Sequence, residues 1–252
     1  MSQGWVFRTG EFRAIVAPLS VTLVLLFAAP SVNRGQQRAS VPDLIQRFEN
    51  TTVFWQQIEV AKEIVAAKDT SVLPKLESWL THEDRHLRGN AAFIYAGLGD
   101  RRGFDVIESI LRDHSERPHG QGIPGGRWSL QAQIGADRYY AAHLLGDLKD
   151  PRAVSILVPL LKDTEVNYIV PWSLGQIADA SAIPPLIRTL SDPNPSMRVL
   201  AIYALLELKA TEALPRLRQL LGDNERSNFG KLESFADAAR DAIAKLQSEN
   251  HH

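Results

Sequence analysis

Residues 182–205, AIPPLIRTLSDPNPSMRVLAIYAL, decide the fold of this chain because they spell two short helices joined by a turn. Apolar residues recur at helical spacing in the first half, and an apolar run with small residues forms the second. Asp192 and Pro193 between the halves are typical of a turn, where a missing backbone N–H costs little. One such pair cannot bury its own apolar face, so neighbouring pairs must stack against it.

The same pattern occurs on both sides of this stretch. Residues 153–163 and 213–223 repeat its first half, and their terminal aspartates lie 29 residues before and 31 residues after Asp192. A glycine that is typical of a helix end recurs at Gly146 and Gly175, again 29 residues apart. The period predicts an all-α fold, an α-solenoid of about five to six antiparallel helix pairs of roughly 30 residues each.

This pattern resembles the HEAT-repeat family, and within it the short HEAT-like repeats of phycobilin lyases. The best match is residues 181–210, where Asp192 stands six residues before Arg198, and the resemblance extends over about residues 73–246. It implies a polar ladder in which such Asp–Arg pairs link adjacent units.

Two positions depart from the family pattern. Ile169 stands six residues after Asp163, where the pattern has an arginine, and His82 stands six residues before Arg88, where it has an aspartate. We therefore expect a partial ladder on an intact apolar framework.

The beginning of the chain has the layout of an export segment. Arg8 and Arg13 precede an uncharged, strongly apolar stretch at residues 14–32. A basic start followed by an apolar run predicts either a cleaved signal peptide or an uncleaved membrane anchor, within residues 1–31. The two arginines should stay in the cytoplasm, so we expect an exported, periplasmic or otherwise extracytoplasmic protein, with a possible inner-membrane tether through residues 14–32.

The predicted organisation after this segment has three parts. They are a polar linker at 32–40, N-terminal capping helices at 41–70, and the repeat solenoid at 71–248. The net charge of −1 argues against nucleic-acid binding, which favours a basic excess. The absence of cysteine excludes disulfide scaffolds, thiolate zinc sites and cysteine nucleophiles.

Two insertions interrupt the period, near residues 113–136 and 224–234. Gly99 and Gly146 lie 47 residues apart, against a period near 30, so the first insertion is the longer. Insertions on one edge of a solenoid often form its binding face. The candidate partner-binding side chains in this loop are Arg117, His119, Arg127 and Trp128. The alternative is that the loop folds over the core and buries Trp128.

Residues 82–86, HEDRH, match the H-E-x-x-H string of zinc hydrolases. On one helix this string offers two imidazoles to zinc and a carboxylate as general base. Repeat register instead places His82 in the turn position of Asp192, so we expect a helix to begin inside the string. A metal-dependent hydrolase that uses His82 and His86 is kept as an alternative.

Known enzymes of this repeat class give no second motif. Deoxyhypusine hydroxylase holds its di-iron centre with His-Glu pairs at the start of second helices, but the equivalent positions here are Ala92, Tyr139 and Tyr168. No residue excludes phycobilin lyase activity, although an exported chain would not meet that substrate.

The interpretation that follows is a non-catalytic scaffolding module of the bacterial envelope, without metal or cofactor. It would bind a protein partner on the concave helix face and the inserted loop, with a lyase-like HEAT enzyme as an alternative.

Overall fold

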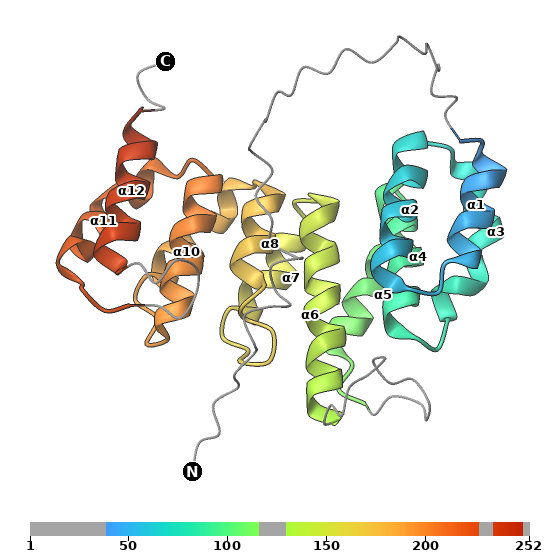
Figure 1. The fold of residues 1–252 in the computed structure, drawn as a ribbon, viewed down its shortest axis with the longest axis horizontal. Helices are drawn as coiled ribbons and strands as arrows, with labels where there is room; N and C mark the ends of the chain where they lie inside the picture. The colour runs from blue at the N-terminus through green and yellow to red at the C-terminus, as the bar shows by residue number, and fades with distance from the viewer. Residues whose placement is uncertain (1–38, 116–129, 227–233, 249–252) are drawn as a thin grey trace, which may run out of the picture. The chain divides into compact units, whose positions relative to one another are not determined.

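The structure, a computed structural model, describes residues 39–115, 130–226 and 234–248. Within these ranges twelve α-helices follow one another as six antiparallel pairs (Figure 1). The pairs are α1 (Val41–Asn50) with α2 (Phe54–Ala67), α3 (Leu73–Leu76) with α4 (Arg85–Gly97), α5 (Arg101–Arg112) with α6 (Leu130–Leu148), α7 (Ala153–Leu160) with α8 (Val170–Ile177), α9 (Ile183–Thr189) with α10 (Pro195–Glu207), and α11 (Leu214–Gln219) with α12 (Phe235–Ser248).

The first helices of the later pairs are short because their sequences favour tight turns at each end. Before α9, the Asp179 carboxylate accepts the backbone N–H of Ser181 at 2.9 Å and opens a 3₁₀ turn over Ala180–Ala182. Pro184 then stands in the first turn of α9, where no backbone N–H is needed. The equivalent aspartate before α3, Asp69, caps the turn at Thr70–Val72 in the same way.

The second member of each pair packs on the second member of the next, from α2 through α4, α6, α8 and α10 to α12. A single core of aliphatic residues runs between the two rows of helices. It includes Ile64, Leu76, Ile94, Ile107, Leu144, Leu157, Leu174, Leu186 and Leu205. The predicted all-α solenoid of helix pairs is confirmed, because the described helices follow one another in pairs that share this one core.

The second helices approach closely where small residues stand at the contact. A Cβ added to Gly146 of α6 would lie 2.8 Å from the Cα atom of Ser173 in α8. The Ser173 hydroxyl donates a hydrogen bond across the same contact to the backbone oxygen of Ala142, at 2.9 Å. Glycine and serine therefore set the distance between these two helices.

Arginines of second helices form a ladder between adjacent pairs, as the family resemblance implies. In each rung the guanidinium reaches an aspartate in the turn of the following pair. The rungs are Arg85 to Asp113 at 2.8 Å, Arg138 to Asp163 at 2.5 Å, and Arg198 to Asp223 at 3.9 Å. Within its own pair, Arg198 donates only to the backbone oxygen of Asp192, at 2.9 Å. The rungs therefore join neighbouring pairs to one another.

The ladder is interrupted at the pair α7–α8, where Ile169 replaces the arginine. Asp192 accepts the backbone N–H of Asn194 at 2.8 Å. The Asn194 amide in turn donates to the Tyr168 hydroxyl at 2.8 Å, which links this turn to the preceding pair. A neutral contact thus stands where the three rungs have a charged one.

Residues 130–136, assigned to the first insertion, instead form the first turns of α6, since they contain no proline and continue the helical pattern. Five predictions lie outside the described residues: the predicted export segment at 1–31 and the side chains of Arg117, His119, Arg127 and Trp128. No helix in the described part of the chain is both long enough and apolar enough to cross a membrane.

Candidate functional site

The HEDRH string lies across the beginning of a helix, as its repeat register predicts. Helix α4 begins at Arg85, and the Asp84 side chain caps it by accepting the backbone N–H of His86 at 2.8 Å. His82 therefore stands in the turn before the helix, while His86 stands in its first turn.

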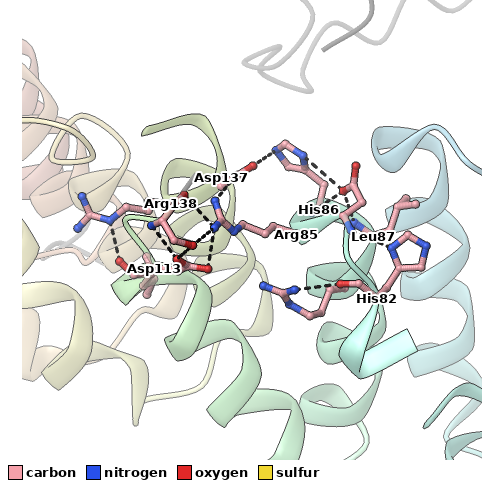
Figure 2. A network of polar contacts seen from close by, with 11 residues as sticks. His82, Arg85, His86, Leu87, Asp113, Asp137 and Arg138 are labelled. Carbon is pink, nitrogen blue, oxygen red and sulfur yellow. Dashed lines mark hydrogen bonds and ion pairs between the residues drawn. The ribbon is translucent and has the colours of Figure 1, made fainter. Parts of the chain in front are cut away.

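The two imidazoles of the string contact different neighbours (Figure 2). His82 stacks on Trp79 with ring centroids 5.2 Å apart, and its Nδ1 accepts the backbone N–H of Asp84 at 3.0 Å. His86 stacks on Phe54 at 4.2 Å. No group of three or more histidine, aspartate or glutamate side chains in the described ranges could hold a metal ion. The geometry thus offers no support for the hydrolase alternative.

Arg85, which the sequence analysis did not single out, is the centre of a buried polar network (Figure 2). Its guanidinium donates to Asp137 at 3.1 Å and to the backbone oxygen of Ser115 at 3.0 Å, and it pairs with Asp113. The Asp137 carboxylate is fully buried and also lies 3.5 Å from His86 Nε2. Because each of these buried charges has a partner, we assign the network to holding α4, α5 and α6 together.

Next to this network, aromatic rings form a continuous row across four second helices. Phe54 of α2 stacks on His86 of α4, and the His86 ring meets Tyr140 of α6 edge-on at 5.1 Å. Tyr140 is nearly parallel to His143 at 6.4 Å, and His143 stacks on Trp172 of α8 at 4.5 Å. We call these five residues the ring row.

The far end of the ring row follows the repeat. His143, Trp172 and Tyr203 occupy equivalent positions of α6, α8 and α10, at the same intervals of 29 and 31 residues as the turn aspartates. One helical turn further along, the equivalent positions hold Asp147, Gln176 and Glu207. The Tyr203 side chain is 43% exposed, so the aromatic positions extend to the surface of the molecule.

An ion pair between α2 and α6 lies beside the ring row. Lys62 Nζ is 3.0 Å from Asp147 Oδ2 and 3.2 Å from Glu59 Oε1 on its own helix. The same Asp147 oxygen is 3.8 Å from His143 Nδ1, an atom that makes no hydrogen bond in the described structure. Side chains of α2 thus reach α6 past α4.

Burial and these charges fix the ionisation of the site near neutral pH. Burial lowers the pKa of His143, the Lys62 charge lowers it further, and Asp147 opposes both, so the imidazole is neutral. Burial likewise raises the pKa of Tyr140 well above its ordinary value, helped by the Asp147 charge, and its hydroxyl donates to Asn90 at 2.5 Å. For Lys62 burial acts to lower the pKa, but the bonds to Asp147 and Glu59 outweigh it.

The site therefore places two neutral rings, Tyr140 and His143, beside one charged pair. The sequence analysis did not single out Lys62 and Asp147, whose contact only the fold creates.

Two family models match adjacent parts of the chain. The model of HEAT repeats matches residues 163–229, and the model of the PBS lyase HEAT-like repeat matches residues 137–163.

Curated relatives carry related names. The chain is 30% identical over 145 residues to "Bilin biosynthesis protein PecE" of Nostoc sp. (strain PCC 7120), which covers 56% of this chain and 53% of the relative. The protein of the same name from Mastigocladus laminosus is also 30% identical, over 56% and 49%. "Phycocyanobilin lyase subunit alpha" of Synechococcus elongatus is 35% identical over 96 residues, 34% of this chain and 35% of the relative. The chain spans about half the length, or less, of these relatives.

These relatives contradict the interpretation of the chain as a non-catalytic envelope scaffold and as a non-enzyme. That interpretation relied on the lack of a catalytic motif and on the expected export. A surface that is assembled from several repeats leaves no local motif, so the lack of one is weak evidence against catalysis. The repeat pattern, the helix pairs and the two matching models show that the chain contains HEAT repeats of the phycobilin-lyase type.

Proposed function

We propose that the chain binds an open-chain tetrapyrrole, a bilin, along the ring row and takes part in a lyase-like reaction that transfers the bilin to or from a protein partner. The observation that carries the proposal is the row itself, in which His143 and Trp172 stack at 4.5 Å and Phe54 and His86 at 4.2 Å. A bilin is a flat, conjugated chain of four pyrrole rings, and such rings stack favourably on aromatic side chains.

The length of the row suits a long ligand. It crosses α2, α4, α6 and α8, and packed helices lie about 8–10 Å apart. A compact ligand would need only one or two neighbouring helices. An extended tetrapyrrole can contact several of them at once, which fits a site that repeats from one pair to the next.

The lack of cysteine supports the role of carrier. With no cysteine in its 252 residues, the chain cannot hold a bilin through a thioether of its own. Any bilin that it binds through the ring row is then held without a covalent bond and can pass to another protein. The proposed partner is that acceptor or donor protein.

Titration with biliverdin, a free bilin, tests this proposal. We expect the wild-type chain to shift the visible absorbance of biliverdin and to induce circular dichroism in it, and we expect denaturation in urea to release the pigment completely. Trp172→Ala should weaken binding by about tenfold, since a stacked aromatic pair contributes on the order of 1 kcal/mol beyond its buried area.

Trp79→Ala provides the matched control. Trp79 also stacks on a histidine, His82, but outside the ring row. Both variants are first checked for the helical signal in the far ultraviolet. Equal weakening by the two variants, or no optical change with the wild-type chain, would count against the proposal.

A further inference from the structure

We infer that the ion pair between Lys62 and Asp147 is the polar recognition site for this ligand, with Asp147 accepting pyrrole N–H groups and Lys62 binding a propionate carboxylate. The inference rests on the proposed function, because it names the groups of a bilin that the ring row alone would not distinguish from other flat molecules. A bilin carries both kinds of group, N–H donors along its centre and two carboxylates at its side.

The position of the ion pair supports this assignment. Asp147 stands one helical turn beyond His143, whose ring is the stacking partner of Trp172, so its carboxylate lies beside the ring row. Lys62 belongs to α2, which packs on α4 as α6 does, and its Nζ reaches past α4 to within 3.0 Å of the Asp147 carboxylate. A ligand stacked on the rings of α6 and α8 would thus present its polar atoms to this pair.

The exposure of the pair indicates that a ligand can reach it. The Lys62 side chain is 41% exposed, whereas the Asp147 side chain is 16% exposed. The ladder rung at Arg138 is different, since that guanidinium is 3% exposed and has two carboxylate partners. Lys62–Asp147 is open enough to exchange partners, while its carboxylate is shielded enough from water for a new hydrogen bond to contribute to affinity.

Both groups keep a partner when the ligand enters. Lys62 already contacts Glu59 at 3.2 Å, and in the complex it would also meet the propionate. Asp147 would exchange one ammonium donor for pyrrole N–H donors. Neither charge is left buried and alone, which is the condition under which an ion pair can be opened at low cost.

The neighbouring imidazole fits the same arrangement. His143 Nδ1 is buried, has no hydrogen-bond partner in the described structure, and lies 3.8 Å from the Asp147 oxygen that Lys62 contacts. A polar ligand atom between these two groups would supply the missing hydrogen bond. The site therefore combines an acceptor and an unpaired imidazole nitrogen, one helical turn apart on α6, with a cation that reaches them from α2.

Biliverdin and biliverdin dimethyl ester, which lacks free carboxylates, separate the two roles. In the full chain we expect the ester to bind about tenfold more weakly than biliverdin, as for one charge-assisted hydrogen bond. Lys62→Met should lower the affinity for biliverdin by about the same factor and leave the affinity for the ester unchanged. Asp147→Asn should weaken both ligands by about tenfold, because both retain the pyrrole N–H groups.

Two variants control for the change of charge. Asp105→Asn removes an exposed carboxylate on α5, and Lys75→Met removes an exposed lysine on α3, both outside the ring row. Neither should alter the affinity for either ligand.

The outcomes distinguish this inference from the proposed function. If the wild-type chain binds neither ligand, the proposed function fails and the inference fails with it. If it binds biliverdin but Lys62→Met weakens the ester as much as the acid, or Asp147→Asn changes neither affinity, only the inference is overturned. Far-ultraviolet circular dichroism of each variant shows whether it is folded. In Asp147→Asn the Lys62 ammonium should keep its contact with Glu59.

Discussion

Arginine recurs in the ladder on the second helices because one guanidinium can donate hydrogen bonds to several acceptors at once. Arg138 donates to the backbone oxygen of Leu111 at 2.7 Å, to Asp163 at 2.5 Å, and to Glu165. These acceptors lie in two different helix pairs. A lysine could not present donors to all three in a fixed plane, so the ladder depends on arginine in particular.

Arg138→Ala should lower the free energy of unfolding by about 3 kcal/mol, because it removes the guanidinium that two partly buried carboxylates share. Urea denaturation followed by circular dichroism measures the change. Arg101→Ala, which breaks the exposed pair between Arg101 and Asp105, should change stability by less than about 0.5 kcal/mol. Similar losses of unfolding free energy in the two variants would show that this rung stabilises the fold no more than an exposed ion pair does.

The rung between Arg138 and Asp163 also predicts how the stability of the fold changes with pH. Burial by itself would raise the pKa of Asp163, but the hydrogen bonds from Arg138 and from the backbone N–H of Glu165 outweigh it and lower the pKa. The unfolded chain then binds more protons than the folded one, so stability rises with pH through this range.

We therefore expect the contribution of Asp163 to be complete above about pH 5 and to be lost as the pH falls through the lowered pKa, below the ordinary value of about 3.9. Urea denaturation at steps from pH 6 to pH 3 measures it. In Arg138→Ala the free energy of unfolding should fall less steeply with decreasing pH, since the main hydrogen-bond donor to Asp163 is gone. A decline of equal steepness in both proteins would assign the acid sensitivity to other carboxylates.

At the scale of the element, the contact between two second helices depends on the residue at one repeated position. Gly146 and Gly175 are equivalent in α6 and α8, yet their surroundings differ. A Cβ at Gly146 would lie 2.8 Å from the backbone of Ser173, whereas a Cβ at Gly175 would lie 3.4 Å from Ala204, an ordinary contact distance. The same substitution should therefore have opposite effects in neighbouring repeats.

Gly146→Ala should destabilise the chain by about 1–3 kcal/mol, because α6 and α8 must move apart. Gly175→Ala should be neutral or stabilising by up to about 1 kcal/mol, since alanine favours the helix more than glycine. Thermal unfolding of the two variants beside the wild-type chain makes the comparison. Loss of stability in Gly175→Ala would show that helix spacing is equally tight at both contacts.

At the scale of the whole molecule, the features that could be predicted from the sequence are those that recur from one helix pair to the next. The turn aspartates at 163, 192 and 223 and the glycines at 146 and 175 gave the period, and the period gave the solenoid. The spacing predicted an insertion near residues 113–136 but did not fix where α6 begins, since the register of the repeat is lost in an insertion.

The candidate site was harder to foresee for a physical reason. His86 and Tyr140 are neighbours only because α4 packs on α6, and Lys62 meets Asp147 only because α2 and α6 both flank α4. Such contacts join unlike positions of different pairs, so no period in the sequence points to them. The aromatic residues at 143, 172 and 203 do follow the period and were the available clue.

The location of the whole molecule in the cell decides where a bilin could be met, and export is our proposal from the first 31 residues. The charges of Arg8 and Arg13 should hold the start of the chain in the cytoplasm while the apolar stretch at 14–32 enters the membrane. Expressed in full in a bacterium with an outer membrane, the chain should therefore appear in the periplasmic or the membrane fraction. A variant without residues 1–31 should stay in the cytoplasm, and mass spectrometry of the exported form separates a cleaved signal peptide from an anchor. Recovery of the full chain in the cytoplasmic fraction, together with bound pigment, would contradict export and place the bilin chemistry inside the cell.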